Sequence, residues 1–147
     1  MSNRKFENSP DDIVIVSGAR TAVAKFGGSL KTMSAIDMGS IVVAEAVKRA
    51  GIDPAVVDEC IIGQVGGWGP NGFVARAISL KAGLPNETCA YSVNRQCGSG
   101  LQSIADGIME IKCGQSEVVV AGGSESLSQL PYYVPSARWG ARMGHKQ

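Results

Sequence analysis

One of the four cysteines, Cys97, stands where a short apolar run over residues 89–93 gives way to an amphipathic pattern. From Leu101 onward, apolar residues recur at i, i+3, i+4 and i+7, which predicts a helix with one apolar stripe packed against a core. At the start of such a helix, unpaired N–H groups and the positive end of the helix dipole favour a thiolate over a thiol. We therefore interpret Cys97 as a nucleophile, with its own backbone N–H as a candidate donor to an oxyanion.

The residues around Cys97 suit this role. Gly98 and Gly100 have no Cβ, so another backbone or a substrate can approach the sulfur closely. The preceding run reads as a strand, which places the thiol at a carboxyl end, where open α/β sheets carry their chemistry. The alternative is that Cys97 is a small buried hydrophobic residue, as most free cysteines are.

No second catalytic group is evident. The one histidine, His145, lies in an Arg-Met-Gly-His segment and is interpreted as an exposed loop residue. Cys60, Cys89 and Cys113 are interpreted as packing residues. Because no CxxC pair is present, the sequence predicts no metal site.

Strand and helix patterns alternate along the chain. A capping box formed by Ser34 and Asp37 predicts a helix that runs to about Ala50 and is closed by Gly51. Gly114 is expected to end the helix that follows Cys97. The predicted strands are 13–17, 60–63, 89–93 and 117–121, and a further helix is predicted over 73–82. This alternation favours a wound α/β layer with right-handed crossovers.

Composition narrows the classes of function. The chain has 147 residues, 44% of them apolar, which suffices for one domain with a core. Its net charge is only +1, and no basic patch is interleaved with aromatic residues, so nucleic acid is not an expected partner. No run approaches the roughly 18 apolar residues of a membrane span. Four cysteines without a secretory signal indicate a reducing compartment, and we expect a cytoplasmic location.

The segment Asn-Arg-Gln-Cys-Gly-Ser-Gly-Leu-Gln around Cys97 strongly resembles the nucleophile segment of the thiolases. Further stretches resemble that family in order and spacing: 16–23, 26–30, 75–85, 118–128, 131–133, 137–140 and 142–145. The resemblance covers nearly the whole chain after the first dozen residues.

The resemblance implies an α/β fold of the thiolase type, one half of a five-layer αβαβα core, with a mixed sheet and a central nucleophile helix. It also implies a division of the chain. Residues 1–12 would be a polar tail, 13–128 the N-terminal α/β domain, and 129–147 the truncated start of the loop domain.

In function, the resemblance implies an acetyl-CoA C-acyltransferase of fatty acid metabolism. It would transfer acyl groups between CoA thioesters of the acetyl-CoA and acetoacetyl-CoA type, by thiolysis or Claisen condensation, through an acyl-thioester on Cys97. The histidine base and the second cysteine would come from a C-terminal half, either a separate subunit or a missing segment, so this chain alone would be inactive.

The remaining expectations concern ligands and partners. Coenzyme A thioesters would be substrates, with no permanently bound cofactor, and the sequence assigns no CoA-binding residue. A homo-oligomer is expected.

Two other functions stay open: a catalytically incomplete scaffold or lipid-carrier partner with the same fold, and a related ketoacyl-synthase-type condensing enzyme. A thiol redox module is disfavoured because no resolving cysteine sits beside Cys97.

Overall fold

A three-stranded parallel sheet with helices on both faces forms the centre of the computed structural model, which describes residues 9, 11–67 and 69–140. The strands are β1 (Glu59–Gly63), β2 (Cys89–Val93) and β3 (Val119–Gly123), in the order β2-β1-β3. The helices are α1 (Ala35–Ala50), α2 (Val74–Lys81) and α3 (Ser99–Lys112). Both strand pairs are parallel, which confirms the α/β class.

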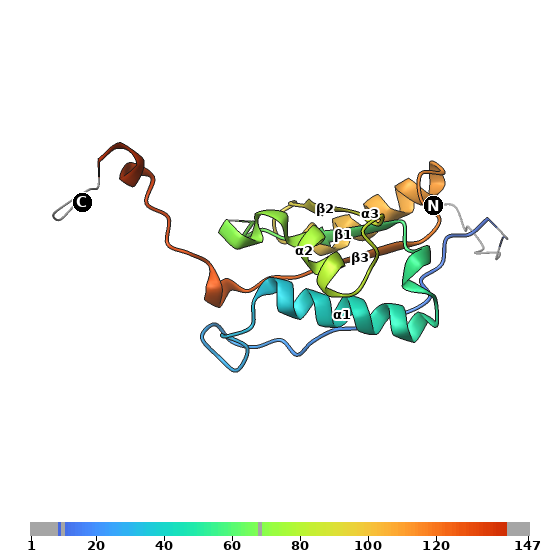
Figure 1. Cartoon of the computed structure of the whole chain (residues 1–147), viewed down its shortest axis with the longest axis horizontal. Coiled ribbons are helices and arrows are strands. Elements are labelled where there is room, and N and C mark those ends of the chain that lie inside the picture. Colours follow the sequence, from blue (N-terminus) through green and yellow to red (C-terminus); the bar gives the residue numbers. More distant parts are fainter. Residues whose placement is uncertain (1–8, 10, 68, 141–147) are drawn as a thin grey trace, which may run out of the picture.

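The helices form two layers around the sheet (Figure 1). α1 and α2 pack together on one face, and α3 packs against β1 and β3 on the other. Side chains along β1 point alternately to the two faces of the sheet, so this strand contributes to the helix–sheet interface on each face. Cys60 and Ile62 enter the core with α1 and α2, while Ile61 faces α3. All three side chains are buried, so β1 is the hydrophobic centre of the sheet.

Both ends of α1 follow the sequence prediction. Asp37 N–H donates to Ser34 Oγ at 3.0 Å, and the Asp37 carboxylate accepts the Ser34 N–H at 3.2 Å, which completes the capping box. At the other end Gly51 adopts φ +69°, a left-handed conformation that glycine reaches without a Cβ penalty.

The buried face of α3 differs from the prediction. Its buried residues are the small ones, Ser99, Ser103 and Gly107, whereas Leu101 is 75% exposed and Ile108 is also exposed. A Cβ on Gly107 would lie 3.0 Å from Val119 Cγ1, so only a small residue allows this approach to β3. The predicted apolar stripe is therefore only partly covered, because Ile104, Ala105 and Ile111 are half-buried whereas Leu101 and Ile108 are exposed.

The predicted first strand, 13–17, is also not a strand in the structure. It runs beside α1, held by a hydrogen bond from Ser17 Oγ to Ala46 O at 2.6 Å (Figure 1). An apolar cavity of about 410 Å³ lies between residues 13–19 and β3, so this segment has no strand partner in the described structure. The described strands supply only the parallel part of the mixed sheet that the resemblance implies.

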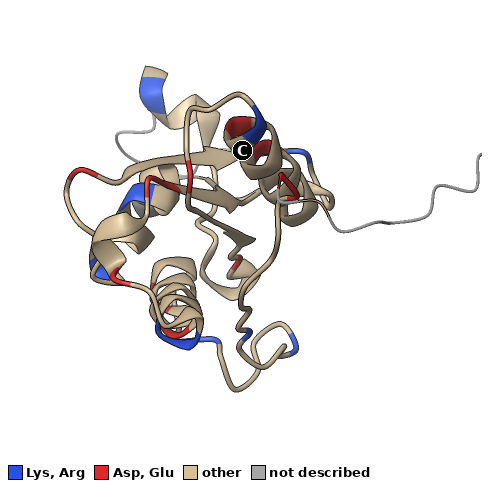
Figure 2. Ribbon diagram, turned by 90° about the vertical axis from the view of Figure 1, so that its right-hand side faces the viewer, with Lys and Arg blue, Asp and Glu red and all other residues tan. Residues whose placement is uncertain are grey.

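The surface outside this core carries charges of both signs, which lie next to one another on the helices (Figure 2). After β3, residues 124–130 stay against the start of α1 and the loop after β1, and residues 131–140 extend away from the α/β body (Figure 1). The described part of this segment carries two short 3₁₀ turns, Leu127–Gln129 and Pro135–Trp139. The boundary at 128/129 stays a prediction. In the described ranges, no helix combines the length and the apolar character needed to cross a bilayer.

A salt bridge between Asp37 of α1 and Lys81 of α2 joins the two helices that pack together on one face of the sheet. The hydrogen bond from Lys81, together with those from the Ser34 side chain and backbone, lowers the pKa of Asp37 to about 2. Because this folded pKa lies below the unfolded value of about 3.9, the contribution of Asp37 to stability is complete above that value. It disappears as the pH falls through about 2.

We predict that Lys81→Met raises the pKa of Asp37 toward its ordinary value, because the hydrogen bond that lowers this pKa most is lost. NMR titration of the Asp37 side chain measures this directly. Lys112→Met, at the end of α3, is the control and should leave the titration unchanged. An unaltered Asp37 titration in Lys81→Met would contradict the salt bridge.

Candidate active site

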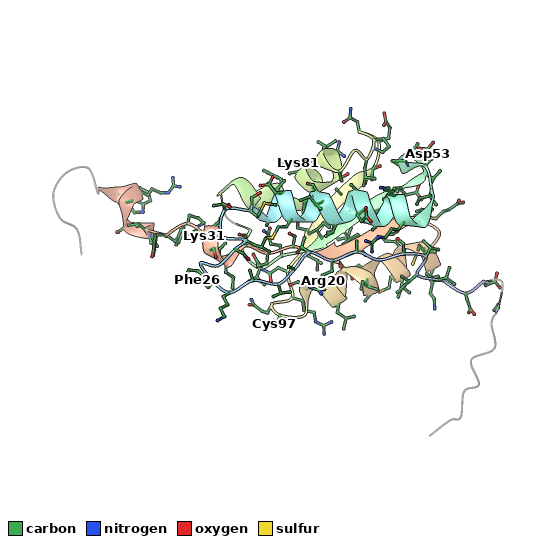
Figure 3. The ribbon with its side chains drawn as sticks, turned by 90° about the horizontal axis from the view of Figure 1, so that it is seen from below. Arg20, Phe26, Lys31, Asp53, Lys81 and Cys97 are labelled. Atoms are coloured by element: carbon green, nitrogen blue, oxygen red, sulfur yellow. The ribbon has the colours of Figure 1, made fainter. Side chains whose placement is uncertain are left out.

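Cys97 lies in the turn that connects β2 to α3, close to the first residue of the helix (Figure 3). Its side chain is exposed. Gly98 occupies the N-cap position and has no side chain, so no side-chain acceptor caps the first turn of α3. The backbone donors of that turn, with the positive end of the helix dipole, remain directed toward this end of the helix. Cys97 therefore occupies the kind of position that the sequence predicts.

The turn before the helix is held by its own side chains. Gln96 has φ +51°, and it is the one non-glycine residue with positive φ among the described residues. Asn94 Oδ1 accepts the Gln96 N–H at 3.0 Å, and Ser99 Oγ donates to Gln96 O at 2.6 Å while accepting the Arg95 N–H at 2.9 Å. A left-handed conformation strains a non-glycine residue, and it persists only where the surroundings impose it. Here these hydrogen bonds impose it, and they fix the backbone that carries Cys97.

The first turn of α3 sits directly against the ends of β1 and β3. A Cβ on Gly63 would lie 2.4 Å from the carbonyl carbon of Ser99 and 2.6 Å from Gly100 N. A Cβ on Gly123 would lie 3.4 Å from Gly100 Cα. Ser103 Oγ donates to Gly122 O at 2.8 Å and so anchors the next turn. Glycine at the strand ends lets the helix start approach, which brings Cys97 to the carboxyl edge of the sheet.

A cavity of about 320 Å³ opens at this junction. Its lining combines glycines and polar side chains: Gly63, Gln64, Gln96, Cys97, Ser99, Gly100, Gly123, Ser124 and Glu125. In contrast to the apolar cavity beside β3, this one carries several hydrogen-bonding groups, a composition that suits a small polar ligand.

Gln64 is the unusual member of this lining. Its side chain is 4% exposed, yet neither Oε1 nor Nε2 hydrogen-bonds another group in the described part of the chain. An unpaired buried polar group costs about 1–3 kcal/mol, so native structures contain few of them.

Glu125 ties together the loops that follow β1 and β3. Its carboxylate accepts the Val65 N–H at 2.8 Å and the Gly66 N–H at 3.3 Å. The serines on either side connect the same loop to the start of α1. Ser124 Oγ donates to Ala35 O at 2.6 Å, and Ser126 Oγ donates to Met33 O at 2.8 Å. Hydrogen bonds thus connect the loops at the carboxyl edge of the sheet on both sides of the cavity.

The other predicted residues lie elsewhere. Cys60 is buried in the core, and burial raises the pKa of its thiol to about 12, which agrees with a packing role. Cys89 and Cys113 are exposed, contrary to their interpretation as packing residues, and neither lines the cavity. His145 falls outside the described residues. Within the described residues, no group of three or more His, Cys, Asp or Glu residues is arranged to hold a metal ion.

Sequence reasoning missed Gln64, Ser99 and Glu125. A usable signal existed for Gln64, because it directly follows the apolar run 60–63 and so stands at a strand end, as Cys97 does. No comparable signal marked Ser99 or Glu125, since their roles depend on backbone groups that only the folded turns bring near.

Comparison with known proteins identifies relatives over almost the whole chain. The family model described as "Thiolase, N-terminal domain" matches residues 13–147. An acetyl-CoA acetyltransferase of Pseudomonas aeruginosa is 46% identical over 134 residues, which cover 91% of this chain and 34% of that protein. An acetyl-CoA acetyltransferase of Cupriavidus necator is 47% identical over 133 residues, covering 90% and 34%. The chain therefore spans about a third of the length of these curated relatives.

Solved structures agree with the sequence matches. The crystal structure of the Bacillus anthracis acetyl-CoA acetyltransferase superposes with a TM-score of 0.86 at 41% identity, over 91% of this chain and 34% of that chain. The Acat5 thiolase from Ascaris suum, in complex with coenzyme A, superposes with a TM-score of 0.80 at 37% identity, over 82% and 32%.

We predict that Gly63→Ala destabilises the fold by about 1–3 kcal/mol, because its Cβ would overlap the backbone at the start of α3. Gly122→Ala is the matched control, since a Cβ at that neighbouring sheet position has no heavy atom within 4 Å. Urea denaturation of both variants measures the difference. Equal stability of the two variants would contradict the close approach.

We also predict that iodoacetamide at pH 8 alkylates Cys97, Cys89 and Cys113 in the folded chain but not Cys60. The first three are exposed, whereas Cys60 is buried with a pKa raised to about 12. Peptide mapping by mass spectrometry locates the label, and alkylation in urea serves as the control in which Cys60 should react. Labelling of Cys60 at the rate of the other three would refute its place in the core.

Proposed function

Because the chain belongs to the thiolase family, by its match to the N-terminal domain, we propose that it contributes the nucleophile to acyl transfer between CoA thioesters. The relatives named acetyl-CoA acetyltransferase support acetyl-CoA as a substrate, and acetoacetyl-CoA is added by the family resemblance. The observation that carries this proposal is the exposed thiol of Cys97 on a hydrogen-bonded turn at the start of α3, facing a polar cavity.

The proposed reaction has two halves. In the first, the Cys97 thiolate attacks the thioester carbonyl, a tetrahedral oxyanion forms, and its collapse breaks the bond between acyl carbon and CoA sulfur. CoA leaves as a thiolate that takes up a proton, and the acyl group remains on Cys97. In the second half of condensation, the α-carbon of a second acyl-CoA, after losing a proton, attacks the acyl-cysteine, forms a carbon–carbon bond and releases the Cys97 thiolate. Thiolysis is the reverse: the Cys97 thiolate attacks the ketone carbonyl of a 3-ketoacyl-CoA, the bond between that carbonyl carbon and the α-carbon breaks, and the α-carbon of the leaving acyl-CoA takes up a proton. A CoA thiolate then removes the acyl group from Cys97.

The turn geometry supports the first half. The hydrogen bonds of Asn94 and Ser99 hold the backbone of Cys97 before substrate arrives, so little reorganisation is required at the moment of attack. The N–H groups of Gly98 and Ser99 already donate to Arg95 O and Gln96 O, so the donors at the start of α3 that support oxyanion binding are those of the next residues, which no side chain caps.

The proton-transfer groups are proposed to come from outside the described residues. By family resemblance they are a histidine base and a second cysteine in a C-terminal half, supplied as a separate subunit or as further chain. Among the described residues the cavity contains one carboxylate, Glu125, and both its oxygens are already engaged by backbone N–H groups. This supports the proposal that the described chain does not turn over by itself.

Exposed apolar side chains on α3 and on the segment at 14–16 also support a C-terminal half as the partner of this chain. On α3, Leu101, Ile108 and Met109 are exposed, and the extended segment at 14–16 exposes three large aliphatic side chains. Large apolar side chains that remain exposed on one helix and one segment are typical of an interface. We propose that a second α/β half covers α3 and that the assembly forms a homo-oligomer.

A scaffold or lipid-carrier role remains the second candidate function. The exposed apolar side chains of α3 favour it as well, since they serve assembly whether or not Cys97 reacts. The two functions differ in whether Cys97 becomes acylated.

We predict that intact-mass analysis of the assembly from its own source, after addition of acetyl-CoA or acetoacetyl-CoA, detects an acetyl adduct that Cys97→Ala abolishes. Cys97→Ser should retain the fold and lose nearly all of the rate, because a hydroxyl is far less ionised than a thiol near neutral pH. Cys113→Ala is the matched control, since Cys113 is exposed but does not line the cavity.

Native mass spectrometry of the same sample tests the partner. A C-terminal-half polypeptide together with the adduct supports the proposed enzyme. A homo-oligomer of this chain without any adduct supports the scaffold, and turnover of Cys97→Ser at the original rate would exclude Cys97 as the nucleophile.

A further inference from the structure

The side chain of Arg95 links the turn that carries Cys97, residues 94–98, to the helix α3. Arg95 Nη1–H donates to Gln102 Oε1, and Gln102 Nε2–H donates in turn to Asp106 Oδ1 at 2.6 Å. We call these three side chains the Arg95 strap. None of them lines the cavity that Cys97 lines, and the proposed reaction, as described so far, does not use them.

Opposite charges at the two ends of the strap fix the carboxamide between them. A guanidinium only donates hydrogen bonds, and a carboxylate only accepts them. Gln102 therefore satisfies both groups in one orientation of its carboxamide, with Oε1 toward Arg95 and Nε2 toward Asp106. Each of the two hydrogen bonds has an ionised partner, and such bonds are stronger than those between neutral groups. The i, i+4 spacing of Gln102 and Asp106 makes them neighbours on one face of the helix.

The strap starts from a backbone that is itself held. Arg95 N–H donates to Ser99 Oγ at 2.9 Å, and Arg95 O accepts the Gly98 N–H at 3.1 Å. Gln102 N–H donates to Gly98 O at 2.9 Å, so the backbone and the side chain of Gln102 both connect to this turn. Arg95 Cγ and Cδ lie 4.0 Å from the position that a Cβ on Gly98 would occupy. The strap therefore passes beside the residue that directly follows Cys97.

The conformation of the turn requires such support. Gln96, between Arg95 and Cys97, has φ +51°, which a non-glycine residue keeps only where its surroundings impose it. Residues 95–98 are all exposed, so packing contributes little to holding them. Hydrogen bonds from side chains, including the strap, are therefore what hold the backbone on either side of the thiol.

We propose that Arg95 and Gln102 are positioning residues for Cys97, because the strap holds the turn on α3 in the conformation in which the thiolate attacks a bound thioester. This inference rests on the proposed function, since it concerns the acylation of Cys97. Neither residue contacts the acyl group, and both act by restricting the backbone that carries the sulfur. Misplacing a reacting group by about 1 Å can cost about a hundredfold in rate, so a loosened turn slows the attack.

A double-mutant cycle tests the strap, because the same link can be broken from either side. Arg95→Met removes the donor and the positive charge, whereas Gln102→Met removes the acceptor and keeps that charge. Lys112→Met is the matched control for charge, since it removes a cation from the last turn of α3. Each variant is prepared in the complete assembly, and the acylation of Cys97 is followed by intact mass at several concentrations of acetyl-CoA.

We expect Arg95→Met and Gln102→Met each to lower the maximal rate of acylation about tenfold, as a displacement smaller than 1 Å would. The acetyl-CoA concentration that gives half of the maximal rate should stay unchanged, because neither side chain contacts the substrate. The double variant should be no slower than either single variant, since both substitutions break the same link. Lys112→Met should match the wild type.

Hydrogen exchange of the same assemblies, measured by mass spectrometry, provides a second readout that does not depend on the reaction. The peptide that spans residues 94–102 should exchange faster in Arg95→Met and in Gln102→Met than in the wild type, because the turn opens more often. The peptide that spans α1 should exchange at the wild-type rate in both variants.

The outcomes distinguish this inference from the proposed function. Acylation of both single variants at the wild-type rate would overturn the role of the strap while leaving Cys97 as the nucleophile. A loss in Arg95→Met but not in Gln102→Met would also overturn it, since Arg95 would then act through its charge. Additive losses in the double variant, or faster exchange of α1, would overturn it as well. A wild-type assembly that is never acylated would overturn the proposed function itself.

Discussion

The arrangement of the candidate site depends on the close approach of the first turn of α3 to the ends of β1 and β3. This contact exists because Gly63 and Gly123 have no side chains where the helix start meets the strands. It brings a helix N-terminus, a thiol and two strand ends into one small volume, and the polar cavity forms at that junction. A larger residue at Gly63 would separate these parts before any chemistry at Cys97 was affected.

Glycine allows α3 to approach the strand ends, and hydrogen bonds from polar side chains then hold this arrangement in place. Ser103 pins α3 to Gly122, Glu125 binds the loop after β1, and Ser124 and Ser126 bind the approach to α1. These contacts surround the cavity from three elements. These hydrogen bonds hold the loops at the carboxyl edge of the sheet, which is where a preorganised site is required.

The same packing leaves several large apolar side chains exposed on the surface of the described structure. Since the buried residues of α3 are serines and a glycine, Leu101, Ile108 and Met109 of this helix remain exposed. Likewise the apolar segment at 13–17 stays separate from β3, with an apolar cavity between them. Both features are consistent with a chain that spans about a third of its relatives and that is proposed to pack against further polypeptide.

The sequence by itself determined the helices, the strands other than the one predicted at 13–17, and the position of the thiol. The capping box of Ser34 and Asp37, the glycine stops and the strand runs 60–63 and 89–93 are local signals, because each depends on residues a few positions apart. Cys97 was recognisable for the same reason, as a thiol just ahead of a helical pattern. Its role as the nucleophile stays a proposal.

Only the tertiary structure decided which face of α3 is buried, whether 13–17 pairs with a strand, and which side chains join Cys97. Periodicity marks an apolar stripe but not what covers it, and the available partner here is a sheet that accepts only small residues. Gln64 and Cys97 are 33 positions apart in the chain, and their shared cavity depends on the parallel pairing of β1 with β2. Such long-range contacts follow from packing and are not written in any local pattern.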